Sequence, residues 1–184
     1  MNKKSLISLL AVSSLALSLA FSGCAPQNGS QPAQSLSPKS ASSKAAVPAE
    51  AEATLLYYKA SDDGLKIIPQ SMKVKARDRT AKTALEEMIR ADRKARYPIL
   101  PAGLSLKSIA IKEGTAYADF SSELNSLKGE TAESLFIAMT VDTLTEFPNI
   151  NEVVIRTEGK SPKFQMDMTK PFKRDESYIQ MEKK

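Results

Sequence analysis

A broad apolar helix in the C-terminal half of the chain constrains its fold more than any other feature. The spacing of apolar residues predicts this helix between Gly129 and Phe147, and Pro148 ends it. Its wide apolar face is formed by Ala132, Leu135, Phe136, Ile137, Met139, Thr140, Val141, Thr143, Leu144 and Phe147. A stripe of this width predicts burial against a sheet. Residues 152–159 (EVVIRTEG), which follow a short turn, are expected to be one strand of that sheet.

The residues before this helix predict two pairs of strands, at 53–59, 65–76, 104–112 and 115–120. The first pair is joined by the turn Asp62-Asp63-Gly64, and Pro69 places its second strand at a sheet edge or a bulge. The second pair is expected to be an antiparallel hairpin that turns at Glu113-Gly114, with a register slip near Lys107-Ser108.

A further helix is expected between the two pairs, because apolar residues recur there at helical spacing: Ala81, Ala84, Leu85, Met88 and Ile89. Either Asp78 or Thr80 can act as its N-cap. A short last strand is expected at residues 164–168. The order strand, strand, helix, hairpin, helix, strand predicts an α+β fold, a single two-layer sandwich domain with two helices on one mixed or antiparallel sheet.

The N-terminus has the order of an export signal. Residues 1–23 begin with Lys3 and Lys4, continue with an apolar run of 16 residues that four serines interrupt, and end in Ser22-Gly23 before Cys24. The run is shorter than the roughly 20 residues that span a bilayer. The stretch FSGC resembles a bacterial lipobox, in which Phe21 replaces the usual leucine. The alternative is a plain secretory signal followed by an incidental thiol.

Cys24 is the only cysteine of the 184 residues, so an exported chain cannot use it in an internal disulfide. We therefore expect Cys24 to carry a diacylglyceryl group, with acyl chains such as palmitate, that anchors the protein on the extracytoplasmic face of the cell membrane. Residues 24–52 contain four prolines among many Ser, Ala and Gln and predict a disordered tether. The folded domain is expected at 53–175, followed by a charged tail at 176–184.

The residues available for catalysis argue against an enzyme. The chain contains no histidine, which removes the commonest general base and metal ligand, and its one cysteine lies outside the expected domain. No Gly-x-Ser-x-Gly, Ser-x-x-Lys or phosphate-binding glycine loop is present. We expect no catalytic residues, no metal site and no cofactor.

Two pairs of acids spaced four apart are the best remaining catalytic candidates. They are Asp119 with Glu123 and Asp142 with Glu146. A glycosidase pairs two carboxyl groups across its substrate, normally from different elements. We therefore interpret the second pair as solvated surface charge on the long helix, and Asp119 as a cap or turn former at the end of the hairpin.

A basic stretch is the best candidate for partner binding. The chain has a formal net charge of +5, and residues 73–96 contain nine Lys or Arg against four acids. We predict that Arg90, Arg93, Lys94 and Arg96 bind an acidic partner surface. The alternative is a solvated helix face with pairs such as Lys82-Glu86. Nucleic acid is not expected as a partner, since the export signal opposes it and no aromatic residues are interleaved with the basic ones.

The chain resembles the GerMN domain of sporulation and spore-germination proteins. The resemblance rests on the segments LPAGLSLKSIAIKEGTAYADFSSEL (100–124), TVDTLTEFPNINEVVIRTEGK (140–160) and MDMTKPFKR (166–174). The residues that match the family's pattern are Leu100, Pro101, Gly103, Asp119, Phe120, Ser121, Thr143, Leu144, Thr145, Glu146, Phe147, Pro148, Gly159, Lys160, Asp167, Pro171 and Phe172.

The resemblance implies a fold similar to the ring-building motifs of secretion and sporulation complexes, and a lipoprotein location. It also implies a scaffolding role in sporulation or germination, with a protein partner or self-association. Members of the GerM type carry two such domains, whereas this chain carries one. A binding module for a cell-wall glycan or a small envelope ligand is the alternative function. The cluster at residues 143–160 is then structural rather than reactive.

Overall fold

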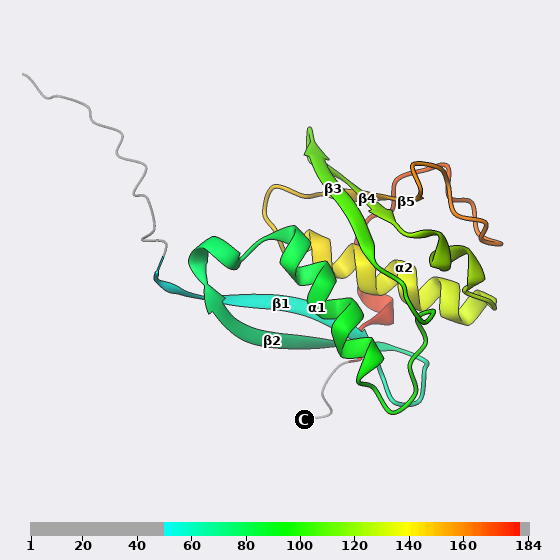
Figure 1. Ribbon diagram of the computed structural model, residues 1–184, viewed down its shortest axis with the longest axis horizontal. Coiled ribbons are helices and arrows are strands. Elements are labelled where there is room, and N and C mark those ends of the chain that lie inside the picture. Colours follow the sequence, from blue (N-terminus) through cyan, green and yellow to red (C-terminus); the bar gives the residue numbers. More distant parts are fainter. Residues whose placement is uncertain (1–49, 181–184) are drawn as a thin grey trace, which may run out of the picture. The chain divides into compact units, whose positions relative to one another are not determined.

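The computed structural model describes residues 50–180 (Figure 1), so the expected export signal, Cys24 and nearly all of the tether lie outside the described residues. The strands are β1 (Glu52–Ala60), β2 (Ile67–Lys75), β3 (Leu106–Lys112), β4 (Thr115–Phe120) and β5 (Glu152–Thr157). The helices are α1 (Ala81–Arg93) and α2 (Glu130–Thr145), with short 3-10 turns at Ala76–Asp78, Ser122–Ser126 and Glu176–Tyr178. In this part of the chain, neither helix has the length and apolar character needed to cross a membrane.

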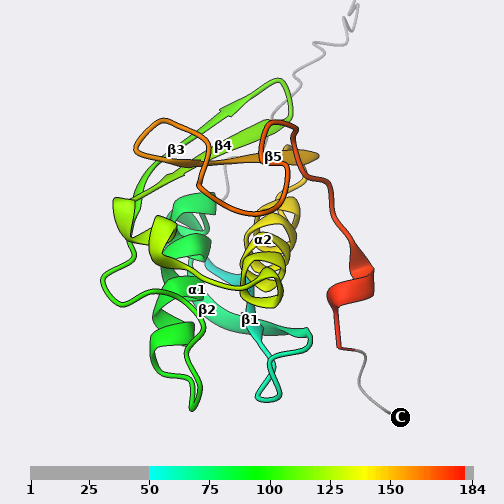
Figure 2. The same ribbon diagram turned by 90° about the vertical axis from the view of Figure 1, so that its right-hand side faces the viewer.

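The α+β class is confirmed, but the strands form two sheets rather than the one expected. β1 and β2 make an antiparallel hairpin, while β3, β4 and β5 make a second sheet in which β4 pairs antiparallel with β3 and parallel with β5. The two helices lie between the sheets, which Figure 2 shows with β3–β5 above them and the β1–β2 hairpin below.

The burial of α2 explains why two sheets are needed. All ten consecutive residues from Leu135 to Leu144 are buried, including Thr140, Asp142 and Thr143. A helix that is buried on every side must be covered on more than one face, and a single sheet covers only one. The width of the apolar stripe therefore indicated burial, but the second covering layer was missed.

Local features of the strands follow the sequence closely. Glu113 and Gly114 both have positive φ at the hairpin turn, and a Cβ on Gly114 would lie 2.7 Å from the Asn151 side-chain nitrogen, so glycine is favoured there. The register of β3 against β4 shifts between Leu106 and Ser108, as expected. Pro69 lies in β2, which within residues 50–180 has β1 as its one neighbouring strand, so of the two predicted positions, an edge or a bulge, the edge is confirmed.

Side chains from both halves of the chain meet in one core. The Phe120 and Phe136 rings pack edge to face with centroids 5.2 Å apart, which joins β4 to α2. Leu55 of β1 and Leu85 of α1 are fully buried in the same core. Thr80 is the N-cap of α1, since its side-chain oxygen accepts a hydrogen bond from the Thr83 N–H at 3.1 Å.

The segment after β5 forms no strand at 164–168, so that expectation was wrong for the described residues. Phe172 instead makes a two-way backbone bridge with Val153 at the outer edge of β5, and the Gln180 N–H donates to the Ile67 carbonyl of β2 at 2.8 Å. We call residues 172–180 the C-terminal strap. It links the two sheets along the side of α2 (Figure 2, in red), and it includes residues 176–180 that the sequence assigned to a charged tail.

Candidate functional site

The C-terminal strap brings a cation to two side chains from different elements. One guanidinium nitrogen of Arg174 donates to the Tyr58 hydroxyl of β1 at 2.7 Å, and the other lies 3.0 Å from the Glu146 carboxylate at the end of α2. The Tyr58 hydroxyl itself donates to the same Glu146 oxygen at 2.9 Å. The Arg174 and Glu146 side chains are only 29% and 22% exposed, so this ion pair is partly shielded from water. The network fastens the strap to β1 and α2.

Asp142 lies one turn before Glu146 and is 1% exposed. Within residues 50–180, neither of its carboxylate oxygens has a hydrogen-bond partner. Burial raises the pKa of Asp142 to about 6. The charge of Arg174 and the nearby backbone N–H of Asp175 act in the opposite direction, but neither makes a hydrogen bond of normal geometry to the carboxylate.

The interpretation of Asp142 and Glu146 as solvated surface charge was therefore wrong. The i, i+4 spacing is the same on an exposed helix and on a buried one, so it carries no information about burial. The burial of Asp142 and the partial burial of Glu146 result from two contacts that the spacing does not show. α2 is covered on all sides, and the C-terminal strap, which is remote in sequence, lies against this turn. The one sequence cue was that Asp142 is the single charged residue between Glu133 and Glu146, in a stretch of mostly apolar residues.

A cavity of about 180 Å³ lies beside Asp142. Its lining comes from one side of α2, from Met166 and from the strap, and comprises Ser134, Ile137, Ala138, Val141, Asp142, Met166, Phe172, Lys173, Asp175 and Tyr178. The cavity surface is mostly apolar. The Asp142 oxygens have almost no accessible surface, and one Asp175 oxygen accepts the Ser177 N–H at 3.0 Å.

The four predicted partner-binding residues do not form one free cluster. Arg90 pairs with Glu87 at 2.6 Å, and Arg93 donates to the Leu104 carbonyl that precedes β3. Lys94 is the C-cap of α1, and the Arg96 guanidinium stacks on the Tyr97 ring at 5.2 Å. The alternative pair Lys82-Glu86 is present at 3.8 Å. Of the four, the structure brings Arg90 and Arg93 together at one surface feature, described next.

A groove of about 360 Å³ separates α1 from the start of β3. The α1 residues that line it are Glu86, Ile89, Arg90 and Arg93, and the facing residues are Leu104, Ser105 and Leu106.

Asp92, which the sequence analysis did not single out, holds the loop that follows α1. Its buried carboxylate accepts the Ile99 and Leu100 N–H groups at 3.1 and 3.0 Å, while burial raises its pKa and these two bonds oppose the rise.

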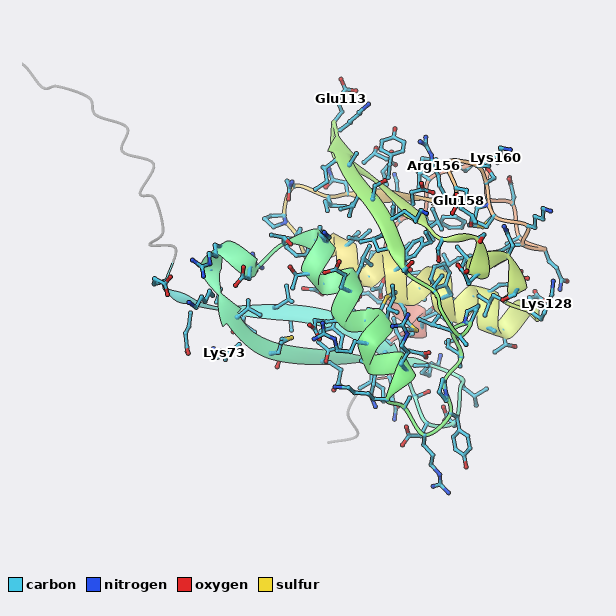
Figure 3. The ribbon with its side chains drawn as sticks, viewed as in Figure 1. Lys73, Glu113, Lys128, Arg156, Glu158 and Lys160 are labelled. Carbon is cyan, nitrogen blue, oxygen red and sulfur yellow. The ribbon has the colours of Figure 1, made fainter. Side chains whose placement is uncertain are left out.

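The outward face of the β3–β5 sheet carries charged and aromatic side chains. The Arg156 guanidinium lies 4.8 Å from the centroid of the Tyr117 ring on the neighbouring strand. Figure 3 shows Arg156, Glu158 and Lys160 together around the end of β5, with Glu113 at the tip of the hairpin. Among residues 50–180, no group of three or more Cys, Asp or Glu is placed to hold a metal ion.

A family model described as "Germane: Sporulation and spore germination" matches residues 55–163, more than half of the chain. The chain belongs to the Germane family. It is 30% identical over 99 residues to the spore germination protein GerM of Bacillus subtilis (strain 168), and the alignment covers 50% of this chain and 27% of GerM. The chain therefore spans about a quarter of the length of this curated relative.

Solved structures of GerM confirm the GerMN resemblance at the level of the Germane domain. The first GerMN domain of the sporulation protein GerM from Bacillus subtilis superposes with a TM-score of 0.51 at 26% identity, covering 67% of this chain and 96% of that one. The tandem GerMN domains of the same protein also give a TM-score of 0.51 at 26% identity, covering 68% of this chain and 46% of that one.

Several residues of the family pattern make contacts inside the Germane domain. The Thr143 hydroxyl accepts the Tyr58 N–H at 3.0 Å, and the Ser121 hydroxyl accepts the Ser105 N–H at 3.0 Å. Asp119 accepts the Gly159 N–H at 2.9 Å, so it caps the turn after β5 rather than a turn of its own hairpin. For these residues the pattern describes how the Germane domain is held together.

Proposed function

We propose that this chain is a membrane-anchored, non-enzymatic lipoprotein of the cell envelope. Its Germane domain holds other proteins in an assembly that serves sporulation or spore germination. Membership of the Germane family and the likeness to GerM support the process. The observation that carries the assembly role is the groove between α1 and β3, which lies beside a strand edge that is free within the described residues.

The free edge of β3 suits pairing with another chain. Within residues 50–180, β3 is hydrogen-bonded to β4 alone, and it ends in the exposed residues Ala110, Ile111 and Lys112. Unpaired N–H and C=O groups on an edge strand are a template for an added strand. The Arg90 and Arg93 side chains beside this edge supply positive charge, which steers an acidic partner and sets its register. Together these features favour a protein partner over nucleic acid.

The anchor is the first part of the proposal to test. If Cys24 carries the lipid, cells that express Cys24→Ala will show no incorporation of radiolabelled fatty acid into the protein, and the unprocessed precursor will accumulate. A matched control is Ser22→Ala, which leaves the thiol in place. Undiminished acyl labelling of Cys24→Ala would show that Cys24 is not the attachment site.

The assembly role is tested with the full lipidated chain in native membranes. We expect a photo-crosslinking residue at Ser105, which lines the groove, to yield a covalent adduct with protein, identified by mass spectrometry. The same residue at Lys73, on the remote strand β2 (Figure 3), is expected to yield none. Confinement to the membrane matters, because it raises the effective concentration at a single weak interface.

Charge reversal on α1 distinguishes crosslinking at a specific interface from crosslinking by random encounter in the membrane. Arg90→Glu combined with Lys94→Glu is expected to reduce the Ser105 adduct by about tenfold, because the steering field changes sign. Arg93 is left intact, since it donates to the Leu104 carbonyl. Lys82→Glu, at the other end of α1, is the control. Equal adducts at Ser105 and Lys73, or none at Ser105, would contradict the assembly role.

A small envelope ligand is the second candidate function, and the cavity beside Asp142 is the observation that favours it.

A further inference from the structure

Two exposed apolar side chains lie at the same end of the domain. Leu65, in the loop between β1 and β2, is 65% exposed, and Tyr97, in the loop between α1 and β3, is 60% exposed. Both loops project from one end of the domain in both views (Figure 1, Figure 2), and we call residues 61–66 and 94–105 the loop end. Neither side chain packs against the core, so the loop end presents apolar surface to its surroundings.

The loop end also carries cations that have no carboxylate partner within residues 50–180. Lys94 and Arg96 are exposed, and neither forms an ion pair there, in contrast to Arg90 of α1. The Arg96 guanidinium stacks on the Tyr97 ring with 5.2 Å between its carbon and the ring centroid. Stacking occupies the flat face of a guanidinium and leaves the N–H groups in its plane available to acceptors. A ring, a cation and free donors are therefore presented together.

The acids of the loop end lie in the other loop. Asp62 and Asp63 precede Leu65, and Asp63 accepts the Leu65 N–H at 3.1 Å, so it shapes the turn. Lys66 in the same loop donates to a backbone carbonyl of the C-terminal strap at 2.7 Å. Residues 94–105 contain no acid. Attraction of an anionic surface is therefore centred on this second loop, while the first contributes an apolar side chain.

This combination fits the surface of a membrane that contains anionic lipid. A tyrosine ring prefers the boundary between acyl chains and headgroups, and lysine and arginine lay their apolar stems there while the charge stays in water. A guanidinium also binds a phosphate through two parallel N–H bonds. We propose that the loop end binds the membrane to which the chain is anchored, with Leu65 and Tyr97 among the headgroups and Lys94 and Arg96 on lipid phosphates. The proposal rests on the anchor at Cys24 put forward above.

The length of chain before β1 permits this orientation. Residues 25–51, which link Cys24 to β1, can span at most about 90 Å at about 3.3–3.6 Å per residue. β1 begins at Glu52 and covers about 30 Å at about 3.3 Å per residue before it reaches the loop end. The anchor therefore allows the loop end to reach the membrane. It also raises the effective concentration of a weakly binding surface there.

Binding at the loop end would turn the assembly surface away from the membrane. The β3–β4 hairpin projects from the opposite end of the domain, where Glu113 marks its tip (Figure 3). Ile111, beside this tip, is the third large apolar side chain exposed within the described residues, at 41%. It provides an exposed position that the proposal places away from lipid.

Tryptophan fluorescence tests the proposal directly, because the chain contains no tryptophan. Leu65→Trp, Tyr97→Trp and Ile111→Trp each introduce a single reporter. Each full chain is coupled through Cys24, its only cysteine, to a maleimide lipid in nanodiscs of phosphatidylglycerol and phosphatidylcholine with brominated acyl chains. We expect the bromine to reduce the fluorescence of the two loop reporters by about twofold or more, and that of Ile111→Trp by less than about a tenth.

Charge reversal at Arg96 is measured with the Leu65→Trp reporter, which lies on the other loop. Arg96→Glu is expected to reduce this quenching by about half or more, because a carboxylate is repelled by lipid phosphates. Replacing phosphatidylglycerol by phosphatidylcholine should have the same effect. Lys82→Glu makes the same change of charge at the N-terminal end of α1 and should leave the quenching unchanged.

Three results would overturn membrane binding by the loop end. They are equal quenching of Ile111→Trp and the loop reporters, no quenching at either loop, and loop quenching that Arg96→Glu leaves unchanged. Chemical coupling makes the outcome independent of whether cells attach a lipid to Cys24. No partner protein is present and Arg96 is not altered in the Ser105 crosslinking, so this proposal, the anchor and the assembly role can fail separately.

Discussion

Replacement of Arg174 by methionine is expected to lower the free energy of unfolding by about 2–4 kcal/mol. Truncating one partner of a buried ion pair costs about 3–5 kcal/mol, and the lower range allows for the 29% exposure of this side chain. The loss arises because Glu146 and the Tyr58 hydroxyl lose their donor while Asp142 loses its nearest positive charge. Methionine keeps the apolar stem of the side chain, so the change reports on charge rather than on packing.

Urea denaturation of the full chain measures this effect, with Arg77→Met as the control. Arg77 pairs with Glu50 and Asp78 at the surface, and its side chain is 53% exposed, so its removal should change stability by less than about 1 kcal/mol. Adding Glu146→Gln to Arg174→Met should cost little more, since both changes remove the same interaction. Equal losses at Arg174 and Arg77 would mean that the strap is not held by this network.

The local features of the fold could be predicted from the sequence, whereas the arrangement of the two sheets could not. Hairpin turns, caps and edges are local, so the turn at Gly114 was placed correctly from its neighbours, and the Thr80 cap and the edge position of Pro69 were each one of two predicted alternatives. The α+β class followed from the order of the elements. The division into two sheets depends on which face of α2 each strand covers, and that is decided by contacts between distant residues such as Tyr58 and Thr143.

Charged residues were the least predictable part of the site. The sequence shows that Asp142 and Arg90 are charged, and it does not show that the first is buried and the second is exposed. The decisive factor for Asp142 is the strap, which begins 30 residues later and covers the cavity wall. For Arg93, the decisive factor is a backbone carbonyl across the groove. Helical spacing alone therefore could not separate a structural cation from one available to a partner.

The buried carboxylate of Asp142 is also expected to make the protein less stable as the pH rises. Its folded-state pKa of about 6 lies above its ordinary value of 3.8, so between these values the folded state binds more protons than the unfolded state. The contribution is present in full below about pH 4 and is lost as the pH rises through about 6. It amounts to about 2–3 kcal/mol, since one pKa unit corresponds to about 1.4 kcal/mol.

Asp142→Asn should therefore stabilise the protein at about pH 7.5, by about 1–3 kcal/mol, and should have little effect at about pH 4, where wild type is already neutral at this position. The two proteins are compared by urea denaturation at both pH values.

The pKa values of Asp63, Asp167 and Asp175 are lowered by hydrogen bonds, so these groups destabilise the fold on acidification. They are common to both proteins and cancel in the difference. A variant less stable than wild type at about pH 7.5 would mean that the ionised carboxylate has favourable partners in the folded protein, and Asp142 would then be a structural anion.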